Sequence, residues 1–579
     1  MSGADSPLSV DETAGTDAAP AGDLLDTARA WLAQDPDGET RAELRGLISA
    51  TESGDAGAEA ALADRFAGRL AFGTAGLRGE LGAGSNRMNR VLVGQAAAGL
   101  ASFLLEQHDR TEQPIVVVGY DGRRKSDVFA VDSAQIFAGA GLRAILLPRL
   151  LPTPVLAFAV RHFGADAGVM VTASHNPPDD NGYKVYLGGP HEGSQIVSPS
   201  DADIAAHIQR IADDGDVSEL PRSLGYETAT EAVVDAYVAA TAAVAPAGIG
   251  ASGVSWVYTA MHGVGWETFS RILEVAGYPA PTVVHAQIHP DGAFPTVSFP
   301  NPEEPGAMDL AFETARSSGA EFVIANDPDA DRLAVAIPDD TADGGWRRLT
   351  GNEIGLLLGW RAARLASASE PVEGASLACS LVSSPGLAAV AERYGLDFHT
   401  TLTGFKWISR APGMIFGFEE ALGYLVNPGT VRDKDGISAA IAMLGFVTGA
   451  RERGETIADL LEDFAATFGA FASDQISVRV DDVSTIGRIM GALRAQHPSS
   501  FGDVAVERVD DLLAGVDGLP PGDVLRFMLT GGSRVIVRPS GTEPKLKLYL
   551  DVRGDSPDDA RLRLARLVAA AREMLDDLG

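Results

Sequence analysis

The sequence predicts an α/β protein in which three similar α/β domains are followed by a smaller α+β domain. Short apolar runs typical of buried strands alternate with longer helical patterns from residue 114 to residue 454, in three successive groups. After residue 470 the pattern changes to alternating strands with turns between them and one amphipathic helix at the end. Because 579 residues exceed what one hydrophobic core usually holds, several domains are expected.

The elements follow in order along the chain. Residues 22–69 have a helical pattern and precede the first group, whose strands are PIVVVGYDGR, RAILLP and AGVMVTAS, with helices in SDVFAVDSAQIFAGAG and TPVLAFAVRHFG between them. The second group contains the strands VSWVYTA, PTVVHAQ, EFVIAND and RLAVAIP. The third contains the strands SLACSLVSS and GMIFGFEE and ends in the long helical run GISAAIAMLGFVTGARERG. The last domain contains the strands QISVRV, VLRFMLT, SRVIVRP and KLKLYLDV.

Acidic or Gly/Pro-rich joints predict where the domains divide. The expected domains are 23–220, 221–339, 340–470 and 471–579. Residues 1–22, which lack a basic start and an apolar core, are expected to form a disordered tail and not a secretory signal.

Charge and composition exclude several kinds of partner. The formal net charge of −33 argues against a nucleic acid or an anionic membrane, because like charges repel at long range. The longest weakly polar run, residues 439–450, is shorter than the roughly 20 residues that span a bilayer. The single cysteine, Cys379, cannot form an internal disulfide and indicates a reducing compartment. The sequence therefore predicts a cytoplasmic protein, and a monomer or dimer is expected.

Ser174 is the first candidate for chemistry, at the end of the apolar run in VMVTASHNPPDDNGYKVY. Open α/β sheets place reacting groups at the carboxyl ends of their strands. A serine-hydrolase elbow would have glycines two residues to either side of the serine, but Thr172 and Asn176 stand there. The alternative is a serine that only caps the turn in NPPDDNG.

The stretch ANDPDADRL places Asp327, Asp329 and Asp331 at alternate positions after a strand. Three carboxylates repel one another unless a hard cation lies among them. A calcium loop is excluded because Arg332 and Pro338 occupy the positions of its glycine and glutamate. The pattern favours Mg²⁺, whose remaining ligands would be a phosphate oxygen and water, and a solvated acidic turn is the alternative.

Three further stretches contain charged residues near turns. In RPSGTEPKLKLY, Arg538 ends a strand and the turn at 540–542 could bind phosphate through its backbone NH groups, although a plain hairpin would use the same residues. The stretch FGTAGLRG contains Arg78, and GFEEALGYLVNPGTVRDKDG contains two glutamates and Lys434. Alone, these two indicate only a glycine-rich turn and the exposed charges of a loop.

Together and in this order, the motifs resemble those of the α-D-phosphohexomutase superfamily, which contains the phosphoglucomutases and phosphomannomutases. TASHNPPDDNGYK resembles its phosphoserine loop, DPDADR its magnesium loop, GFEEALG its sugar-binding loop and RPSGTEP its phosphate-binding loop. The likeness extends from about residue 70 to the end of the chain, with one motif in each expected domain. It implies four domains around a central cleft, the first three with a shared α/β topology.

The resemblance implies a mechanism in which phosphorylated Ser174 transfers its phosphate to a sugar phosphate. The resulting bisphosphate turns over and returns its other phosphate, so that phosphate moves between C1 and C6, or between C1 and C5 of a pentose. A sugar bisphosphate such as glucose 1,6-bisphosphate would be the activator. The implied catalytic residues are Arg78, Ser174, His175, Lys184 and Lys434, and either lysine could move the proton. The implied Mg²⁺ ligands are Ser174, Asp327, Asp329 and Asp331, and the implied substrate-binding residues are Arg332, Gly404, Lys406, Glu419, Glu420, Arg538, Ser540, Gly541 and Thr542.

One departure from the family pattern concerns the choice of sugar. Hexose-specific members tend to have Glu-x-Ser in the sugar loop, where Glu419 and Ala421 stand here. This loop resembles that of the phosphoglucomutase/phosphopentomutase branch and of many bacterial proteins called phosphomannomutase. A phosphoglucomutase with phosphopentomutase activity is therefore expected, with a phosphomannomutase supplying GDP-mannose as the alternative. A hydrolytic phosphatase and a non-catalytic sugar-phosphate-binding protein are the remaining alternatives.

Overall fold

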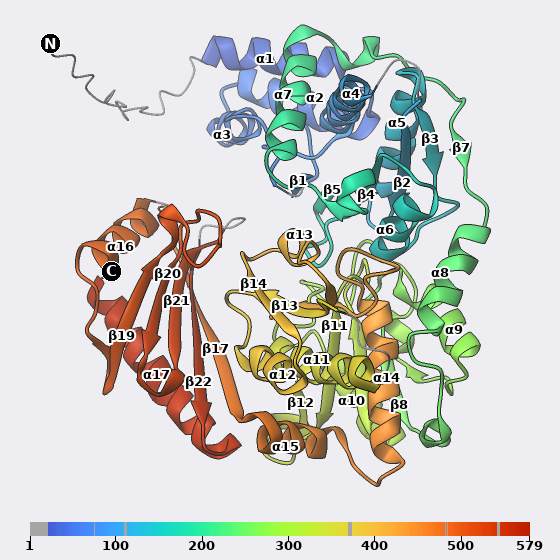
Figure 1. Cartoon of the computed structure of the whole chain (residues 1–579). Coiled ribbons are helices and arrows are strands. Elements are labelled where there is room, and N and C mark those ends of the chain that lie inside the picture. Colours follow the sequence, from blue (N-terminus) through green and yellow to red (C-terminus); the bar gives the residue numbers. More distant parts are fainter. Residues whose placement is uncertain are drawn as a thin grey trace, which may run out of the picture.

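A computed structural model describes residues 21–74, 76–108, 113–368, 373–480, 482, 484–540 and 545–578. The chain forms three sheets flanked by helices and a fourth sheet near its C-terminus (Figure 1). The predicted fold class, three α/β domains and a C-terminal α+β domain, is confirmed. Among the described helices, none is both long and apolar enough to cross a membrane.

Three of the described helices precede the first sheet and pack against its longest helix, α4. Leu44 and Leu62 share one hydrophobic cluster with Val91 and Leu92 of α4. The helical prediction for this segment is confirmed, but the first helix begins two residues inside the predicted tail. Residues 1–20 of that tail lie outside the described residues. The helices are α1 (Ala21–Gln34), α2 (Gly38–Glu52), α3 (Ala56–Arg65) and α4 (Arg90–Gln107).

The first sheet has the strand order β1-β5-β4-β2-β3-β7. β2, β3 and β4 are parallel, and β5 pairs antiparallel with both β4 and β1. This pairing brings the strands that carry Arg78 and Lys184 together at one edge of the sheet. Its elements are β1 (Gly76–Glu80), β2 (Ile115–Tyr120), α5 (Ser126–Gly139), β3 (Arg143–Leu146), α6 (Thr153–His162), β4 (Ala167–Val171), β5 (Asp180–Leu187), β6 (Ser194–Gln195), α7 (Ser200–Asp214) and β7 (Glu227–Thr228).

The second sheet has the order β12-β11-β10-β8-β9. β10 runs parallel to β8 and antiparallel to β11, so the connection between β10 and β11 lies at the carboxyl end of β10. The strand expected in PTVVHAQ is limited to two residues, after which the chain enters a short 3₁₀ turn. The elements are α8 (Ala232–Ala242), β8 (Trp256–Thr259), α9 (Gly265–Ala276), β9 (Thr282–Val283), α10 (Asp309–Ser318), β10 (Phe322–Asn326), β11 (Leu333–Pro338) and β12 (Trp346–Arg348).

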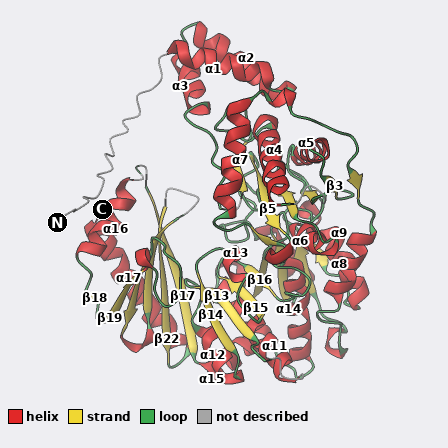
Figure 2. Cartoon of the chain, turned by 45° about the horizontal axis from the view of Figure 1, so that its top comes forward, coloured by secondary structure: helices red, strands yellow, loops and turns green. Residues whose placement is uncertain are grey.

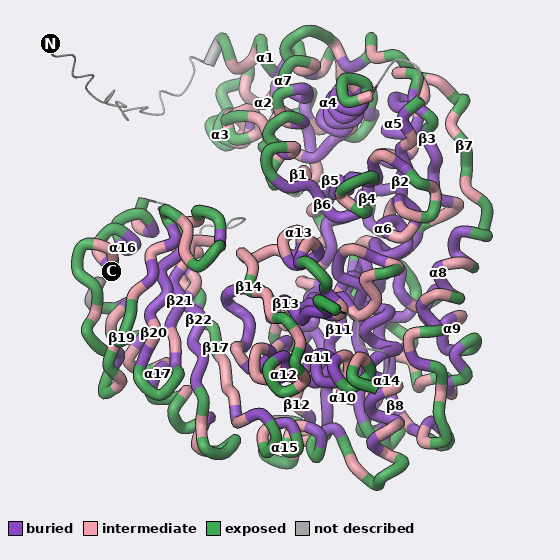
Figure 3. Tube along the Cα trace, in the orientation of Figure 1, coloured by how far each residue is buried: buried purple, intermediate pink, exposed green. Residues whose placement is uncertain are grey.

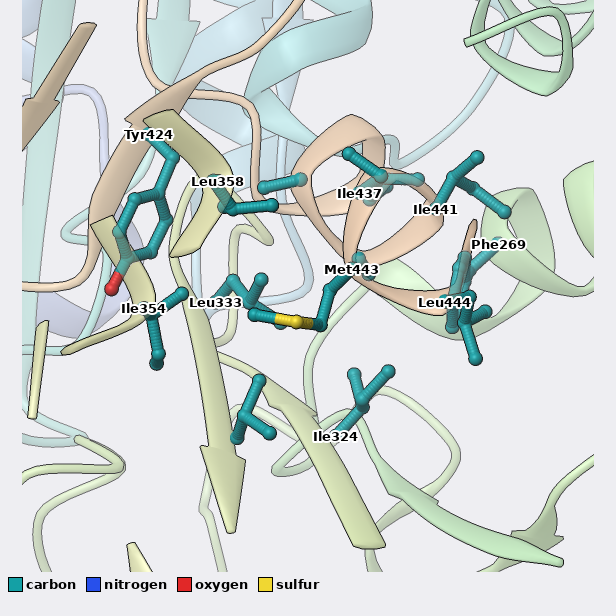
Figure 4. Close-up of a cluster of buried hydrophobic side chains, with 14 of the residues drawn as sticks. Phe269, Ile324, Leu333, Ile354, Leu358, Tyr424, Ile437, Ile441, Met443 and Leu444 are labelled. Carbon is teal, nitrogen blue, oxygen red and sulfur yellow. The ribbon is translucent and has the colours of Figure 1, made fainter. Parts of the chain in front are cut away.

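The third sheet has the order β14-β13-β15-β16 and shares a core with the second through helix α14. Figure 4 shows Met443 and Leu444 of α14 among side chains that include Ile324 of β10 and Leu333 of β11. α14 is buried along most of its length, so it joins the two sheets instead of covering one. The elements are α11 (Gly351–Ala368), β13 (Ser376–Ser380), α12 (Gly386–Tyr394), β14 (Asp397–Thr401), α13 (Phe405–Ile408), β15 (Met414–Glu419), β16 (Gly423–Leu425), α14 (Gly436–Arg451) and α15 (Ile457–Phe468).

The fourth sheet is antiparallel, with the order β17-β22-β21-β20-β19-β18, and two helices pack with it (Figure 2). Figure 3 shows buried segments in the strands of the α/β sheets, and β4, β10 and β13 are buried at every residue. Polar residues that follow these strands therefore lie at the ends of rigid, buried elements. The last elements are β17 (Ala470–Arg479), α16 (Ser484–Ala495), β18 (Ser500–Phe501), β19 (Val504–Asp511), β20 (Leu525–Leu529), β21 (Arg534–Pro539), β22 (Lys545–Gly554) and α17 (Pro557–Leu578).

Candidate active site

The serine and the aspartates that the sequence singles out meet at the ends of two different sheets. Ser174 follows β4 of the first sheet, and Asp327 follows β10 of the second. The Ser174 hydroxyl donates a hydrogen bond of 2.7 Å to Asp327 Oδ2, and both side chains are buried. The carboxyl ends of strands are where α/β sheets place reacting groups, and here two sheets contribute to one site.

The loop around Ser174 is fixed in an uncommon backbone conformation. Ser174 has a φ of 52°, in the left-handed region that costs a residue with a side chain about 1–2 kcal/mol. Thr172 Oγ1 accepts a hydrogen bond of 2.8 Å from Ser174 N. The buried guanidinium of Arg123 donates to the carbonyl oxygens of Ser174 at 2.7 Å and Asn176 at 2.5 Å, and to that of Pro177 at 2.8 Å. Arg123, which sequence reasoning missed, follows a strand in GYDGR.

Asp327, Asp329 and Asp331 form a buried carboxylate cluster in the connection between β10 and β11. One oxygen from each lies within 4.8 Å of the others. Within the described part of the chain, Asp329 Oδ1 and Asp331 Oδ1 have no hydrogen-bond partner. The pKa of Asp327 is held well above its usual range, mainly by burial and in addition by repulsion from the other two carboxylates. Unpartnered oxygens in a buried carboxylate cluster are the donors that a hard divalent cation would satisfy, so the cluster could hold a metal ion.

Two buried lysines contact the same aspartates. Lys184 Nζ donates to Asp329 Oδ2 at 2.7 Å and to Asp331 Oδ2 at 2.8 Å. Lys434 Nζ, from the segment before α14, lies 3.3 Å from the same oxygen of Asp331. Burial lowers the pKa of Lys184, but the two carboxylates outweigh it and hold the pKa above its usual range. Burial also lowers the pKa of Lys434, but the charges of Asp331, Asp433 and Glu419 outweigh it and hold this pKa above its usual range.

Arg332 connects the aspartate cluster to the sugar loop that the sequence predicts. Its backbone NH donates to Asp327 Oδ1 at 3.0 Å. Its guanidinium reaches the third sheet, where Nη1 donates to the carbonyl oxygen of Ala421. Arg332 therefore links the two loops, because its backbone contacts the aspartate cluster and its side chain contacts the sugar loop.

His175 belongs to the serine loop, and Arg78 contacts that loop from β1. Arg78 is exposed on β1, and its Nη1 donates to Asn176 Oδ1 at 3.1 Å. His175 Nδ1 lies 3.2 Å from Ser174 Oγ. The pKa of His175 is held well below its usual range, mainly by burial and in addition by the positive charges of Arg332 and Arg78. The imidazole is therefore neutral near pH 7 and can accept or donate a hydrogen bond at the serine.

The two glutamates of the sugar loop have different surroundings. Burial raises the pKa of Glu419, which ends β15. Glu420 Oε2 accepts hydrogen bonds from Ser380 Oγ at 3.1 Å and Ser383 Oγ at 3.0 Å. Both serines lie at the end of β13 and were not singled out from the sequence, because nothing in SLVSSPG distinguishes them from a capping turn.

Lys406 lies in the short helix α13 of the third domain, which contacts the first domain, and Gly404 lies directly before this helix. Gly404 has a φ of 105°, a conformation that favours glycine, and it precedes α13. Lys406 Nζ donates to the carbonyl oxygen of Thr74 at 3.2 Å, just before β1. This contact places Lys406 beside the FGTAGLRG segment that carries Arg78.

Arg538 is the second-to-last residue of β21 and, with Glu419 and Glu420, lies close enough to Tyr549 for its charge to act on that phenol. Burial raises the pKa of Tyr549, and the charges of Glu420 and Arg538 act on the same phenol in opposite directions. The guanidinium of Arg534, on the same strand as Arg538, donates to the carbonyl oxygen of Ser383. The fourth domain is thus attached to the loop that orients Glu420. Ser540 follows β21, whereas Gly541 and Thr542 lie outside the described residues.

Four family models match consecutive segments of the chain. They are described as phosphoglucomutase/phosphomannomutase alpha/beta/alpha domain I at residues 69–214, domain II at 235–341, domain III at 350–468, and the C-terminal domain at 476–567. Each matched segment contains most of the strands of one of the four sheets and one of the motifs that the sequence singles out.

Relatives and solved structures match over most of their length. A Haemophilus influenzae protein named "Probable phosphomannomutase" is 54% identical over 84% of this chain and 98% of its own. A Schizosaccharomyces pombe protein named "Probable phosphoribomutase" is 34% identical over 92% of this chain and 94% of its own. The crystal structure of a "putative phosphomannomutase" from Thermus thermophilus has a TM-score of 0.66 and 25% identity, covering 88% of this chain and 99% of that one.

Proposed function

The chain belongs to the phosphoglucomutase/phosphomannomutase family of intramolecular phosphotransferases, and we propose that it moves phosphate between C1 and C6 of a hexose phosphate through phosphorylated Ser174. The contact of 2.7 Å between the Ser174 hydroxyl and Asp327 supports this most directly. The hydroxyl that we propose to carry phosphate lies there beside carboxylates able to hold a cation. A sugar-phosphate-binding protein without activity would need neither.

In the proposed step, the P–O bond to Ser174 Oγ breaks while a P–O bond forms to a free hydroxyl of the sugar phosphate. The proton of that hydroxyl ends on Ser174 Oγ, so the products are a sugar bisphosphate and an unmodified serine. The bisphosphate turns over and returns its other phosphate to Ser174 by the reverse step. A sugar bisphosphate such as glucose 1,6-bisphosphate would also phosphorylate Ser174 initially and act as the activator.

Lys434 is the proposed carrier of the proton between the sugar hydroxyl and Ser174 Oγ. Its Nζ has carboxylate oxygens at 3.3 and 3.6 Å, whereas Lys184 Nζ has two within 2.8 Å. The less tightly paired lysine is better suited to exchange a proton, and the other to neutralise charge. His175 would orient the serine, and Arg78 and Arg332 would offset the charge of the phosphate.

Mg²⁺ is the cation that we propose for the aspartate cluster. Three carboxylates leave room among six oxygen ligands for a phosphate oxygen on Ser174 and for water. When bound, Mg²⁺ would supply positive charge that stabilises the phosphoryl group in transfer. The unpartnered oxygens of Asp329 and Asp331 support this assignment.

The remaining residues are proposed to bind the sugar phosphate. Glu419 and Glu420 would accept hydrogen bonds from sugar hydroxyls, and Lys406 and Gly404 would line the sugar site from the third domain. The phosphate that is not being transferred would bind to the fourth domain, through Arg538, Ser540, Gly541 and Thr542.

A mannose phosphate is the proposed physiological substrate. The relative named "Probable phosphomannomutase" supports it, because its identity of 54% extends over nearly all of its own length. A glucose phosphate with pentose phosphates is the second candidate. Ala421 in the sugar loop and the likeness to a protein named "Probable phosphoribomutase" favour this broader specificity.

The test is to incubate the protein with mannose 1-phosphate, Mg²⁺ and a trace of mannose 1,6-bisphosphate. Mannose 6-phosphate should accumulate, while inorganic phosphate should not. Release of inorganic phosphate in equal amount to the substrate consumed would identify a phosphatase instead. Retention of substrate without any product would support a binding protein.

A further inference from the structure

The carboxylate of Asp433, next to Lys434, is held by two residues of the first domain. Tyr186 Oη donates to Asp433 Oδ2 at 2.9 Å, and Gln195 Nε2 donates to the same oxygen at 3.0 Å. Asp433 is 1% exposed. Its other oxygen, Oδ1, has no hydrogen-bond partner in the described part of the structure and lies 3.6 Å from Lys434 Nζ. Asp433 thus connects a tyrosine of the first sheet to the ammonium of Lys434.

Tyr186 lies on the same strand, β5, as the other lysine of the site. Residues two apart on a strand share a face, so the side chains of Tyr186 and Lys184 lie on the same side of β5. On that side Tyr186 contacts Asp433, and Lys184 contacts Asp329 and Asp331. Lys184 Nζ is 2.8 Å from Asp331 Oδ2, and Lys434 Nζ is 3.3 Å from that same oxygen. The contacts form a closed ring from Lys184 through Asp331, Lys434 and Asp433 to Tyr186 and back along β5.

The chain on the other side of Lys434 is anchored as well. Tyr237 Oη lies 2.9 and 3.0 Å from the two carboxylate oxygens of Asp435. Asp435 also caps α14 by accepting from Ile437 N at 3.1 Å. Lys434 therefore stands between two buried aspartates, one bound by the first domain and the other by the second. The lysine side chain lies 5.5 Å from the centre of the Phe405 ring, which limits its remaining freedom.

We propose that Tyr186 and Asp433 are positioning residues that hold Lys434 Nζ at the reacting atoms, an inference that rests on the proton-carrying role proposed above for Lys434. A lysine side chain has four rotatable bonds, and its ammonium reaches a defined place only where fixed partners restrict it. A displacement of about 1 Å in a catalytic group can cost about a hundredfold in rate. Tyr186 supplies that restriction through Asp433 without touching the substrate.

The test compares Tyr186→Phe with Tyr183→Phe. Both tyrosines are fully buried on β5, but Tyr183 faces the other side of the sheet, where its Oη donates to Ser133 Oγ at 3.2 Å. Tyr186→Phe should lower kcat by at least about tenfold, with KM within twofold of the wild type. Tyr183→Phe should keep kcat within twofold, and the two variants should have similar Tm. Equal kcat values in the two variants would overturn the inference.

A double-mutant cycle with Lys434→Ala shows whether Tyr186 acts through Lys434. Single-turnover transfer from labelled phosphoserine gives measurable rates in slow variants. If Tyr186 acts through Lys434, Tyr186→Phe should lower the rate by less than threefold in the Lys434→Ala background. A full additional tenfold loss would overturn the inference. Wild-type turnover by Lys434→Ala would instead refute the role proposed for Lys434 itself, so the two failures are distinguishable.

Discussion

Ser174 Oγ donates its hydrogen bond to Asp327 Oδ2 over 2.7 Å, although 153 residues separate them in sequence. The contact exists only while the serine carries its proton. Once Oγ is phosphorylated, a phosphate dianion lies beside three buried carboxylates, and the resulting repulsion must be offset by cations. Lys184 and Lys434 supply two positive charges to this cluster. The geometry therefore supports the proposal that a metal ion is bound when Ser174 is phosphorylated.

The first prediction concerns Ser174. Purified protein should contain one phosphoryl group, and Ser174→Ala should lack it and turn over at least about a hundredfold more slowly, the scale of a key catalytic group. Intact-mass measurement and a mutase assay check the two parts. Ser317→Ala, an exposed serine on α10, is the matched control and should behave as the wild type. Undiminished turnover by Ser174→Ala would refute the phosphoserine mechanism.

The second prediction concerns the metal ion. Activity should require Mg²⁺, and Asp329→Asn should impair it because the proposed site has three carboxylates and one of them is then lost. Asp340→Asn, on the exposed surface, is the control. Calorimetry should show weaker Mg²⁺ binding as the pH falls, since burial raises the pKa of Asp327 and a proton then competes with the cation. Full activity in chelator-treated, metal-free buffer would contradict the assignment.

The third prediction concerns Arg538. A hydrogen bond to a charged group is worth about 1.5–3 kcal/mol, so Arg538→Ala should raise KM roughly ten- to a hundredfold. The turnover number should also fall if closure of the fourth domain depends on the same contact. Arg561→Ala, an exposed arginine on α17, should change neither constant. An unchanged KM in Arg538→Ala would show that the phosphate binds elsewhere.

Much of the fold could be predicted because strand and helix patterns are local. Helix α4 is not among the elements predicted from the sequence, and the reason is physical. It is buried on nearly every side, so RVLVGQAAAGLASFLLEQ has no polar face and no helical alternation of apolar and polar residues. Helix α14 is similarly buried, but its unbroken length and the following RERG made it recognisable.

The site residues that could be predicted stand at strand ends within recognisable motifs. Those that were missed act through contacts between distant segments. Arg123 binds carbonyl oxygens more than 50 residues away, and Ser383 binds Glu420 across two strands of the third sheet. In the sequence pattern Tyr186 cannot be told apart from the apolar residues of β5. Only the folded chain shows that its hydroxyl donates to Asp433. A single sequence contains no signal for pairs of this kind.

The last prediction concerns the sugar. A hydroxyl group introduced at residue 421 should make the site more selective among sugar phosphates. A site discriminates strongly only through polar groups that the wrong substrate leaves unpaired. The wild type, with Ala421, should use mannose 1-phosphate and glucose 1-phosphate with kcat/KM values within about tenfold of each other, and ribose 1-phosphate measurably. Ala421→Ser should shift the ratio towards the hexoses, whereas Ala421→Cys, of similar size but a weaker hydrogen-bonding group, should not. A panel of these phosphates, each with a trace of the matching bisphosphate, measures the ratios. Exclusive use of mannose 1-phosphate by the wild type would show that other residues select the sugar.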